Sequence, residues 1–409
     1  MDNSPLSGIR ILDLTHSWAG PHATRLLADF GAEVIRIEFP GRLCMFRGGV
    51  VENGAYNGHP PWLQLNRNKY CITLDLKRES QKKILQDLVK DADCFVENSR
   101  PGVMESLGFG YRDLCRLNSG IIMLSMSGFG SSGPYARYCG YGAVFEAMGG
   151  IQSFTAYGPG KKPQRIREMD VINGLGGAGA LLTALIYRQR TGEGQHIDLS
   201  QMEFASHLLI GEHLLEQAMN GTSPGPTGNQ HRLSAPQGCY PCQGEDKWVT
   251  LSAHSDREWQ GLCEALGRPD LAREARFADR EGRYEHQDEL DRIITAWSSR
   301  LPHREAMDIL QRHGVPAGAV LDTRELTNDP HLEARDFFLA AESSPDQRYP
   351  GVPYKFAPPG RVRWPGPDLG EHNAYVVRDI LGRPDEDVPE VREEEIRTAY
   401  DSEQNSSPP

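Results

Sequence analysis

The sequence lacks a surplus of positive charge, which argues against one large class of functions. Its 409 residues include 44 Lys and Arg against 56 Asp and Glu, a net charge of −12, and this disfavours a dedicated nucleic-acid binder. The sequence also lacks a basic start followed by an apolar stretch. Its longest apolar run, around residues 176–187, is short for a bilayer and is broken by glycine. We therefore expect neither a nucleic-acid partner nor a membrane partner.

Cysteine is scarce, and its spacing forms no disulfide framework. Eight cysteines in a chain of this length favour a reducing compartment, so we expect a cytoplasmic protein. Cys239 and Cys242 have the spacing of a redox dithiol. Because no second pair completes a zinc site and the motif lies far from the first strand–helix unit, we interpret it as structural and expect no metal.

The order of elements in the first 125 residues predicts an open α/β sheet. Residues 9–15 are typical of a buried strand, Pro21 suits the first turn of a helix that Gly31 ends, and residues 33–38 predict a second strand. This length fits a right-handed parallel crossover. The pattern continues with a helix near 79–91 and strands at 94–97 and 121–125. We therefore expect a Rossmann-like large domain, whose N-terminal part covers residues 1–220.

A smaller α+β domain is expected over residues 225–325. A long helical region, 174–219, precedes it, and residues 221–237 are rich in Gly, Pro, Ser and Thr, which is typical of a linker or mobile loop. Predicted strands and amphipathic helices follow near 238–241, 247–252, 256–266, 286–300 and 303–313. The strongly charged tail after about residue 384 is expected to be disordered.

Asp170 is the first candidate for chemistry, because it precedes a glycine-rich helical segment. A substrate can approach such a carboxylate closely, and backbone N–H groups at a helix start stabilise developing negative charge. A nucleophilic aspartate needs this environment. The alternative is that Asp170 only caps the helix.

A glycine fingerprint, G-x-G-x-x-G, follows at Gly174, Gly176 and Gly179. Taken literally it predicts a dinucleotide site and a nicotinamide-dependent oxidoreductase. The glycines lie inside a helical run rather than between a strand and a helix, so we favour close helix packing as their role.

Several motifs in a fixed order resemble one family over residues 6–383. The matching segments are Gly8–Pro21, Leu26–Glu38, Asn66–Lys69, Thr73–Lys77, Glu97–Gly102, Ser127–Tyr135, Gly314–Val320 and Leu369–His372. This order is similar to the class III CoA-transferases, the CaiB/BaiF or formyl-CoA transferase-like family. The resemblance implies that residues 330–409 return to the large domain.

The same resemblance assigns roles to individual residues. It implies that Asp170 is the catalytic aspartate and that Tyr141 lines the active site; Trp18 is a further candidate for the substrate pocket. The implied coenzyme A contacts are His16, Ser17, Leu74, Lys77, Asn98 and Arg100. Lys77 would pair with a phosphate and Leu74 would pack against the adenine. The alternatives are that His16 caps its loop and that Lys77 is a solvated surface charge.

The implied activity moves CoA from an acyl-CoA donor, with succinyl-CoA as one candidate, to a free carboxylic acid. The reaction passes through a mixed anhydride and an aspartyl-CoA thioester, and CoA acts as substrate with no tightly bound cofactor. The segment 221–237 is a candidate lid, since both intermediates hydrolyse in water. The family implies an interlocked homodimer. The alternatives are an α-methylacyl-CoA racemase, which Gly140-Tyr141-Gly142 disfavours by lacking that branch's Gly-His-Asp, and a CoA-binding subunit of a hetero-oligomer.

Overall fold

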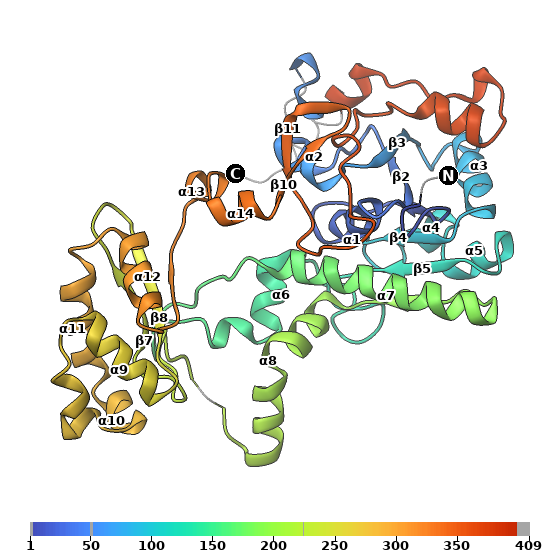
Figure 1. The fold of residues 1–409 in the computed structure, drawn as a ribbon. Helices are drawn as coiled ribbons and strands as arrows, with labels where there is room; N and C mark the ends of the chain where they lie inside the picture. The colour runs from blue at the N-terminus through green and yellow to red at the C-terminus, as the bar shows by residue number, and fades with distance from the viewer. Residues whose placement is uncertain (1–2, 50–51, 224, 399–409) are drawn as a thin grey trace. The chain divides into compact units, whose positions relative to one another are not determined.

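The computed structural model describes residues 3–49, 52–223 and 225–398 and divides the chain into two compact units (Figure 1). The larger unit comprises residues 1–151, 165–220 and 336–409, and the smaller unit comprises residues 152–164 and 221–335. Residues 152–164 and 330–335, which were predicted to belong to the large domain, thus belong to the smaller unit.

A six-stranded parallel sheet forms the centre of the larger unit. Its strands are β1 (Arg10–Asp13), β2 (Glu33–Glu38), β3 (Lys69–Thr73), β4 (Cys94–Glu97), β5 (Ile122–Ser125) and β6 (His196–Asp198). They lie in the order β3-β2-β1-β4-β5-β6, and every neighbouring pair is parallel. This architecture confirms the predicted α/β class.

Helices cover both faces of this sheet, so strands β1 to β5 are buried on both sides, whereas the edge strand β6 is largely exposed. The helices of the larger unit are α1 (Ala19–Ala28), α2 (Pro60–Leu65), α3 (Glu79–Lys90), α4 (Val103–Leu107), α5 (Tyr111–Leu117), α6 (Gly142–Met148), α7 (Met169–Thr191) and α8 (Gln201–Asn220). Successive strand residues alternate between the faces. Leu12 packs in the core that includes α3 and α5, whereas Ile11 packs in the core that includes α1 and α7.

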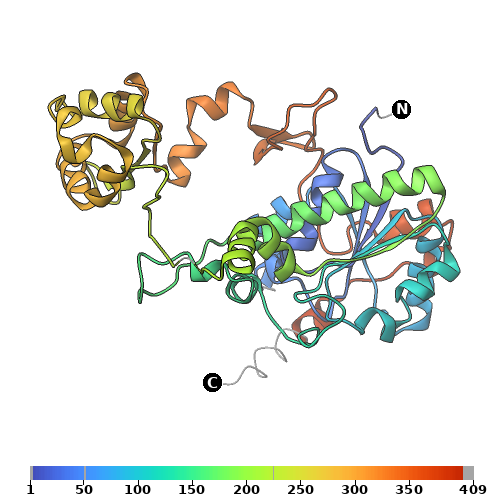
Figure 2. The ribbon, with the colours of Figure 1, turned by 90° about the horizontal axis from the view of Figure 1, so that it is seen from below.

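The fingerprint glycines lie inside α7, which runs alongside the sheet (Figure 2, green). A Cβ atom on Gly174 would lie 2.7 Å from the carbonyl oxygen of Ala19, and one on Gly176 would lie 2.2 Å from the Phe204 ring. These glycines therefore permit close packing against α1 and α8, as predicted, and they form no strand-to-helix phosphate loop.

The expectation that the apolar segment in α7 is too short to cross a bilayer is wrong. The helix has 23 residues and a mean hydropathy of 1.5, so by length and composition alone it is long and apolar enough to cross a membrane. Glycines interrupt the apolar run in the sequence and make it seem shorter than the helix. In the structure these glycines are part of α7. A single helix of this kind is weak evidence for a membrane span, since the core helix of a soluble protein passes the same test; 39% of its apolar stretch is buried, and α7 packs closely against α1.

The chain after α7 differs from the prediction in two further places. Strand β6 divides the expected helical region 174–219 and adds an edge to the sheet. Near the C-terminus, β10 (Phe338–Ala341) and β11 (Ser344–Pro350) form an antiparallel pair, and Tyr375–Ile380 form a π-helical segment.

The expected disorder after residue 384 is also wrong for residues 385–398. This stretch contains a 3₁₀ turn, Asp385–Asp387, and helical residues 393–398. Ile396 is only 1% exposed and packs with Tyr56 and Leu369, so one apolar side chain fixes a segment that is otherwise charged. Residues 399–409 lie outside the described residues.

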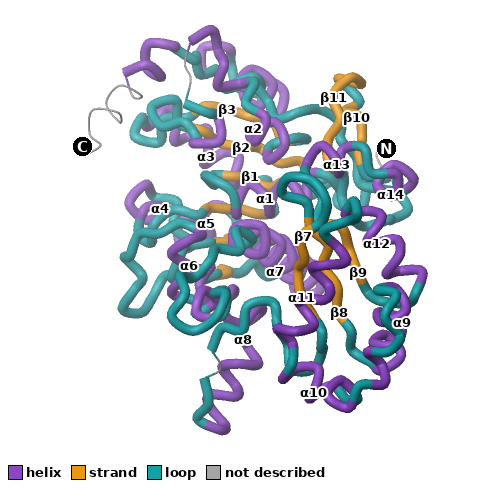
Figure 3. Tube along the Cα trace, turned by 90° about the vertical axis from the view of Figure 1, so that its left-hand side faces the viewer, coloured by secondary structure: helices purple, strands orange, loops and turns teal. Residues whose placement is uncertain are grey.

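The smaller unit packs helices on a three-stranded antiparallel sheet (Figure 3). Its strands are β7 (Gln237–Pro241), β8 (Trp248–Ser252) and β9 (Ala317–Ala319), and its helices are α9 (Asp256–Ala265), α10 (Arg280–Glu285), α11 (Gln287–Ser298), α12 (His303–Arg312), α13 (Thr323–Thr327) and α14 (Pro330–Ala334). Cys239 and Cys242 lie at β7 with free thiols. Burial raises the pKa of both thiols, which suits structural cysteines better than a redox pair.

Candidate active site

The strand order reverses between β1 and β4, and a hydrogen-bonded clamp joins the two loops that leave these strands. The His16 N–H donates to Asn98 Oδ1 over 2.8 Å, and Asn98 Nδ2 donates to the His16 carbonyl oxygen over 2.8 Å. Open α/β sheets bind ligands at the carboxyl ends of their strands where the order reverses. The structure thus brings two of the predicted cofactor contacts together at the expected position.

The start of α1 lies at the same edge and offers free backbone N–H groups. Ser17 has a left-handed backbone, with φ at 63°, and no side chain caps the helix at its N-cap residue, Trp18. A Cβ atom on Gly20 would lie 2.4 Å from Thr15 Cβ, so only glycine lets the loop approach the helix this closely. Burial and nearby guanidinium groups lower the pKa of His16 to about 4, so its ring is neutral at neutral pH. This edge therefore combines a neutral imidazole with the positive end of a helix.

Two predicted cations lie exposed at loops that follow β3 and β4. Lys77 uses its backbone N–H to bind Asp75 Oδ1 over 3.0 Å, and no described residue pairs with its ammonium group. The guanidinium of Arg100 contacts only the sulfur of Cys139, at 3.5 Å, among the described residues. Both groups are therefore available to an anionic ligand.

Leu74 does not lie as predicted. Its side chain is 1% exposed and packs in the core with Ile72. Residues two apart along an extended chain point to the same face, so Leu74 continues the buried face of β3. Its side chain is thus not available to an adenine ring in this structure.

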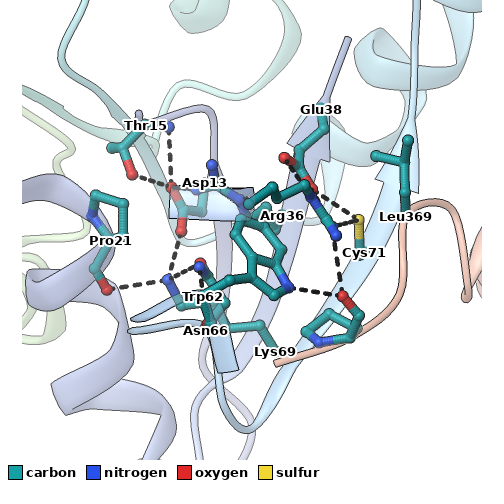
Figure 4. Close-up of polar contacts among 12 residues, drawn as sticks. Asp13, Thr15, Pro21, Arg36, Glu38, Trp62, Asn66, Lys69, Cys71 and Leu369 are labelled. Carbon is teal, nitrogen blue, oxygen red and sulfur yellow. Dashed lines mark hydrogen bonds and ion pairs between the residues drawn. The ribbon is translucent and has the colours of Figure 1, made fainter. Parts of the chain in front are cut away.

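A buried charge network lies beneath this edge (Figure 4). Asp13 accepts hydrogen bonds from Thr15 Oγ1 at 2.6 Å, Thr24 Oγ1 at 2.7 Å and Lys69 Nζ at 3.0 Å, and it pairs with Arg36 at 3.5 Å. Burial alone would raise the pKa of Asp13, but the two cations hold it well below its usual range. The carboxylate therefore remains charged inside the protein.

Lys69 extends the network to the start of α1. Its ammonium group also donates to the Pro21 carbonyl oxygen at 2.9 Å and to Asn66 Oδ1 at 3.0 Å, while burial lowers its pKa to about 8. Glu38 binds Arg47 over 2.7 Å in the neighbouring part of the network. These contacts fix the end of β1, the end of β2 and the first turn of α1 relative to one another.

Asp170 lies in the first turn of α7, next to the start of α1. The helix begins at Met169 and its N-cap residue is Glu168. The alternative hypothesis, that Asp170 only caps the helix, is therefore wrong. Gly174, one turn further along the same face, contacts Ala19 at the start of α1. The structure therefore brings the predicted nucleophile close to the predicted cofactor edge, although about 150 residues separate them in sequence.

The Asp170 carboxylate is half-buried, and no described residue donates a hydrogen bond to it. Burial raises its pKa, and the nearby carboxylate of Glu146 adds to this effect, while Arg165 opposes it. A carboxylate with few hydrogen bonds keeps its lone pairs available for attack on an electrophile.

Gly142 lies directly against this carboxylate. A Cβ atom built on Gly142 would be 2.7 Å from Asp170 Oδ2, so a side chain at this position would displace the carboxylate. Tyr141 precedes it as the N-cap residue of α6 and is 71% exposed. The side chain of Tyr141 is thus exposed, next to the glycine that packs on Asp170.

Glu146 and Arg165 were not predicted from the sequence. Glu146 is 0% exposed; its Oε1 atom lies 3.4 Å from an Arg165 amino group and accepts the Arg167 N–H over 3.2 Å. The available sequence signal was a single acidic residue inside the apolar run Gly-Ala-Val-Phe-Glu-Ala-Met of α6. Within the described parts of the chain, no group of three His, Cys, Asp or Glu side chains could hold a metal ion.

The fold and the site together define an open α/β protein with a ligand edge at its strand-order reversal and a half-buried carboxylate beside it. The sequence model of CoA-transferase family III matches residues 6–373. The chain therefore belongs to CoA-transferase family III and is an enzyme of that class.

Relatives support this assignment along nearly the whole chain. The succinyl-CoA–D-citramalate CoA-transferase of Chloroflexus aurantiacus is 37% identical, over 94% of this chain and 96% of the relative. The beta subunit of the succinyl-CoA–L-malate CoA-transferase from the same organism is 30% identical, over 96% and 98%. A crystal structure of a CaiB/BaiF family protein from Brucella suis is similar with a TM-score of 0.83 and 29% identity, covering 93% of this chain and 100% of that one.

Proposed function

We propose that this enzyme transfers CoA between carboxylic acids through covalent intermediates on Asp170. The observation that carries the proposal is the position of the Asp170 carboxylate, half-buried, without a hydrogen-bond donor among the described residues, and packed on Gly142 next to the start of α1. A carboxylate so placed has an open approach for an electrophile and lies near the edge that offers N–H groups to CoA.

The first half of the reaction moves CoA onto the enzyme. The Asp170 carboxylate attacks the thioester carbonyl of the donor, the carbon–sulfur bond breaks, and CoA leaves as a thiolate from a mixed anhydride. The thiolate then attacks the Asp170 carbonyl carbon. The donor acid departs as a carboxylate, and Asp170 carries CoA as a thioester.

The second half repeats these steps with the acceptor. Its carboxylate attacks the aspartyl thioester and releases the thiolate, which then attacks the acceptor's carbonyl in the new anhydride. The new acyl-CoA forms, and Asp170 is regenerated as a carboxylate. Because both intermediates hydrolyse in water, water must be excluded from the site during the reaction.

We propose that His16, Ser17, Asn98, Lys77 and Arg100 form the CoA edge and that Trp18 and Tyr141 line the acyl pocket. The His16–Asn98 clamp and the unpaired Lys77 ammonium support this assignment. Succinyl-CoA is the proposed donor, since the names of two of the relatives above contain it.

We propose that the chain acts as a homodimer. Both α7 and α8 expose large apolar side chains: Leu175, Ile186, Leu214 and Met219. Exposed large apolar side chains on neighbouring helices favour an interface with another subunit. Static light scattering of the pure chain at micromolar concentration should give twice the chain mass; activity only with a second, different chain would favour the hetero-oligomeric alternative.

The transferase proposal is tested by incubating the pure chain with succinyl-CoA and a panel of free acids, and separating the CoA thioesters by chromatography. A new acyl-CoA should form in proportion to the succinyl-CoA consumed, and Asp170→Asn should abolish it. If no new thioester forms, while an α-methylacyl-CoA exchanges its α-proton in deuterated water, the racemase alternative replaces the proposal.

A further inference from the structure

A buried carboxylate, Glu146, and a guanidinium, Arg165, lie near enough to the proposed nucleophile to act on the pKa of its carboxyl group. Gly142 and Glu146 are four residues apart on α6, so they share one face of the helix about 6 Å apart. Gly142 touches Asp170, and Glu146 holds the Arg165 guanidinium at 3.4 Å. Arg165 therefore lies beside the site where an acyl group would be attached.

The backbone before Asp170 is held in a left-handed conformation, which residues other than glycine rarely adopt. Arg167 has a φ of 63°, and its N–H donates to the buried Glu146 carboxylate over 3.2 Å. Strain of this kind persists only where surrounding contacts enforce it, and it concentrates at functional sites. Glu146 thus fixes both Arg165 and the approach to Asp170 from inside the protein.

Arg165 retains binding capacity toward solvent. Its side chain is 46% exposed, and among the described residues its guanidinium makes a hydrogen-bonded ion pair only with Glu146. A guanidinium has five N–H donors in a planar fork that suits a carboxylate, and the single contact leaves most of them free.

We propose that Arg165 binds the remote carboxylate of the acyl group, so that the substrates of this site are dicarboxylic acids and their CoA thioesters; the inference rests on the proposed function. A four-carbon diacid spans roughly 4 Å between its end carbons, and Arg165 lies near enough to Asp170 to lower the pKa of that carboxyl group. Acylation removes the charge of Asp170. Arg165 then faces one carboxylate fewer near this site, and this favours a substrate carboxylate beside its guanidinium. Glu146 acts as a positioning residue for Arg165.

The test compares two donors that differ only in the remote carboxylate, succinyl-CoA and butyryl-CoA. Release of CoA thiol in the presence of hydroxylamine is measured for the wild type, Arg165→Gln and a control, Arg190→Gln, which removes an equal charge about 30 Å away along α7. We expect R165Q to lower kcat/KM for succinyl-CoA roughly 10- to 100-fold, the value of a charge-assisted hydrogen bond, and to leave butyryl-CoA within twofold. R190Q should match the wild type with both donors, and Arg165→Lys should restore part of the loss.

Binding of free acids separates this inference from the proposed function, because it needs no turnover. Titration calorimetry with glutarate and with butyrate should show tighter binding of glutarate to the wild type and no such preference in R165Q. Equal losses with both donors, or an unchanged preference for glutarate in R165Q, would overturn the role of Arg165. A wild type that prefers glutarate but releases no CoA from either donor would overturn the transferase proposal while supporting this binding site.

Discussion

Replacing Gly142 with alanine should disable the enzyme while leaving it folded. The added Cβ atom would lie 2.7 Å from Asp170 Oδ2, whereas ordinary contacts begin near 3.4 Å, so the carboxylate must move by about 0.7 Å. A displacement of about 1 Å at a reacting group costs up to a hundredfold in rate. The carboxylate is the free end of a side chain and can rotate away, so we expect kcat to fall 10- to 100-fold and the free energy of unfolding to fall by no more than about 1–3 kcal/mol.

The assay for Gly142→Ala is the initial rate of acyl-CoA formation at saturating donor, with urea unfolding measured on the same preparation. Gly318→Ala is the matched control, because the added Cβ atom would meet its nearest neighbour, Thr250 Cγ2, at an ordinary 3.7 Å. Wild-type kcat in a folded G142A protein would refute the reasoning, since it would mean that the position of the Asp170 carboxylate does not limit the chemistry.

Two further predictions concern stability. Burial raises the pKa of Glu97 to about 7 from 4.5, so its contribution to stability is complete below pH 4.5 and is lost as the pH rises through 7. Between pH 5 and pH 8, the free energy of unfolding of the wild type, measured with urea, should therefore fall by roughly 2–3 kcal/mol relative to that of Glu97→Gln. Parallel pH profiles of the two proteins would contradict this. Asp13→Asn leaves Lys69 and Arg36 buried without their shared carboxylate and should lower the free energy of unfolding by about 3–5 kcal/mol. A loss below about 1 kcal/mol would show that the network relaxes around the change.

Local sequence patterns were sufficient to predict most of the larger unit. Short apolar runs predicted β1, β2, β4 and β5, because both faces of these strands are buried, and turn and periodicity signals such as Pro21 predicted α1 and α3. Strand β6 was missed since it has only three residues, two of them exposed, and is defined by its pairing with β5. The ordered segment at 385–398 was missed for a similar reason, since a single contact made by Ile396 outweighs its charged composition.

The candidate site, too, could be predicted from the sequence only in part. Asp170 and the loop residues His16 and Asn98 follow from motifs in the sequence, and the structure places them near one another. The Glu146–Arg165 pair could not be predicted, because it depends on how α6 packs against the segment before α7. The prediction that Leu74 contacts the adenine was wrong, because its position directly after β3 turns its side chain into the core. A motif match carries no information about this direction.

The most direct test of the central claim is peptide mass spectrometry after the pure chain is mixed with succinyl-CoA and trapped with hydroxylamine. Attack on either the anhydride or the aspartyl thioester converts an enzyme carboxylate to a hydroxamate, so we predict this modification on the peptide that contains Asp170 and its absence in D170N. An unmodified Asp170 in a preparation that transfers CoA, or a hydroxamate on another carboxylate, would contradict covalent catalysis by this residue.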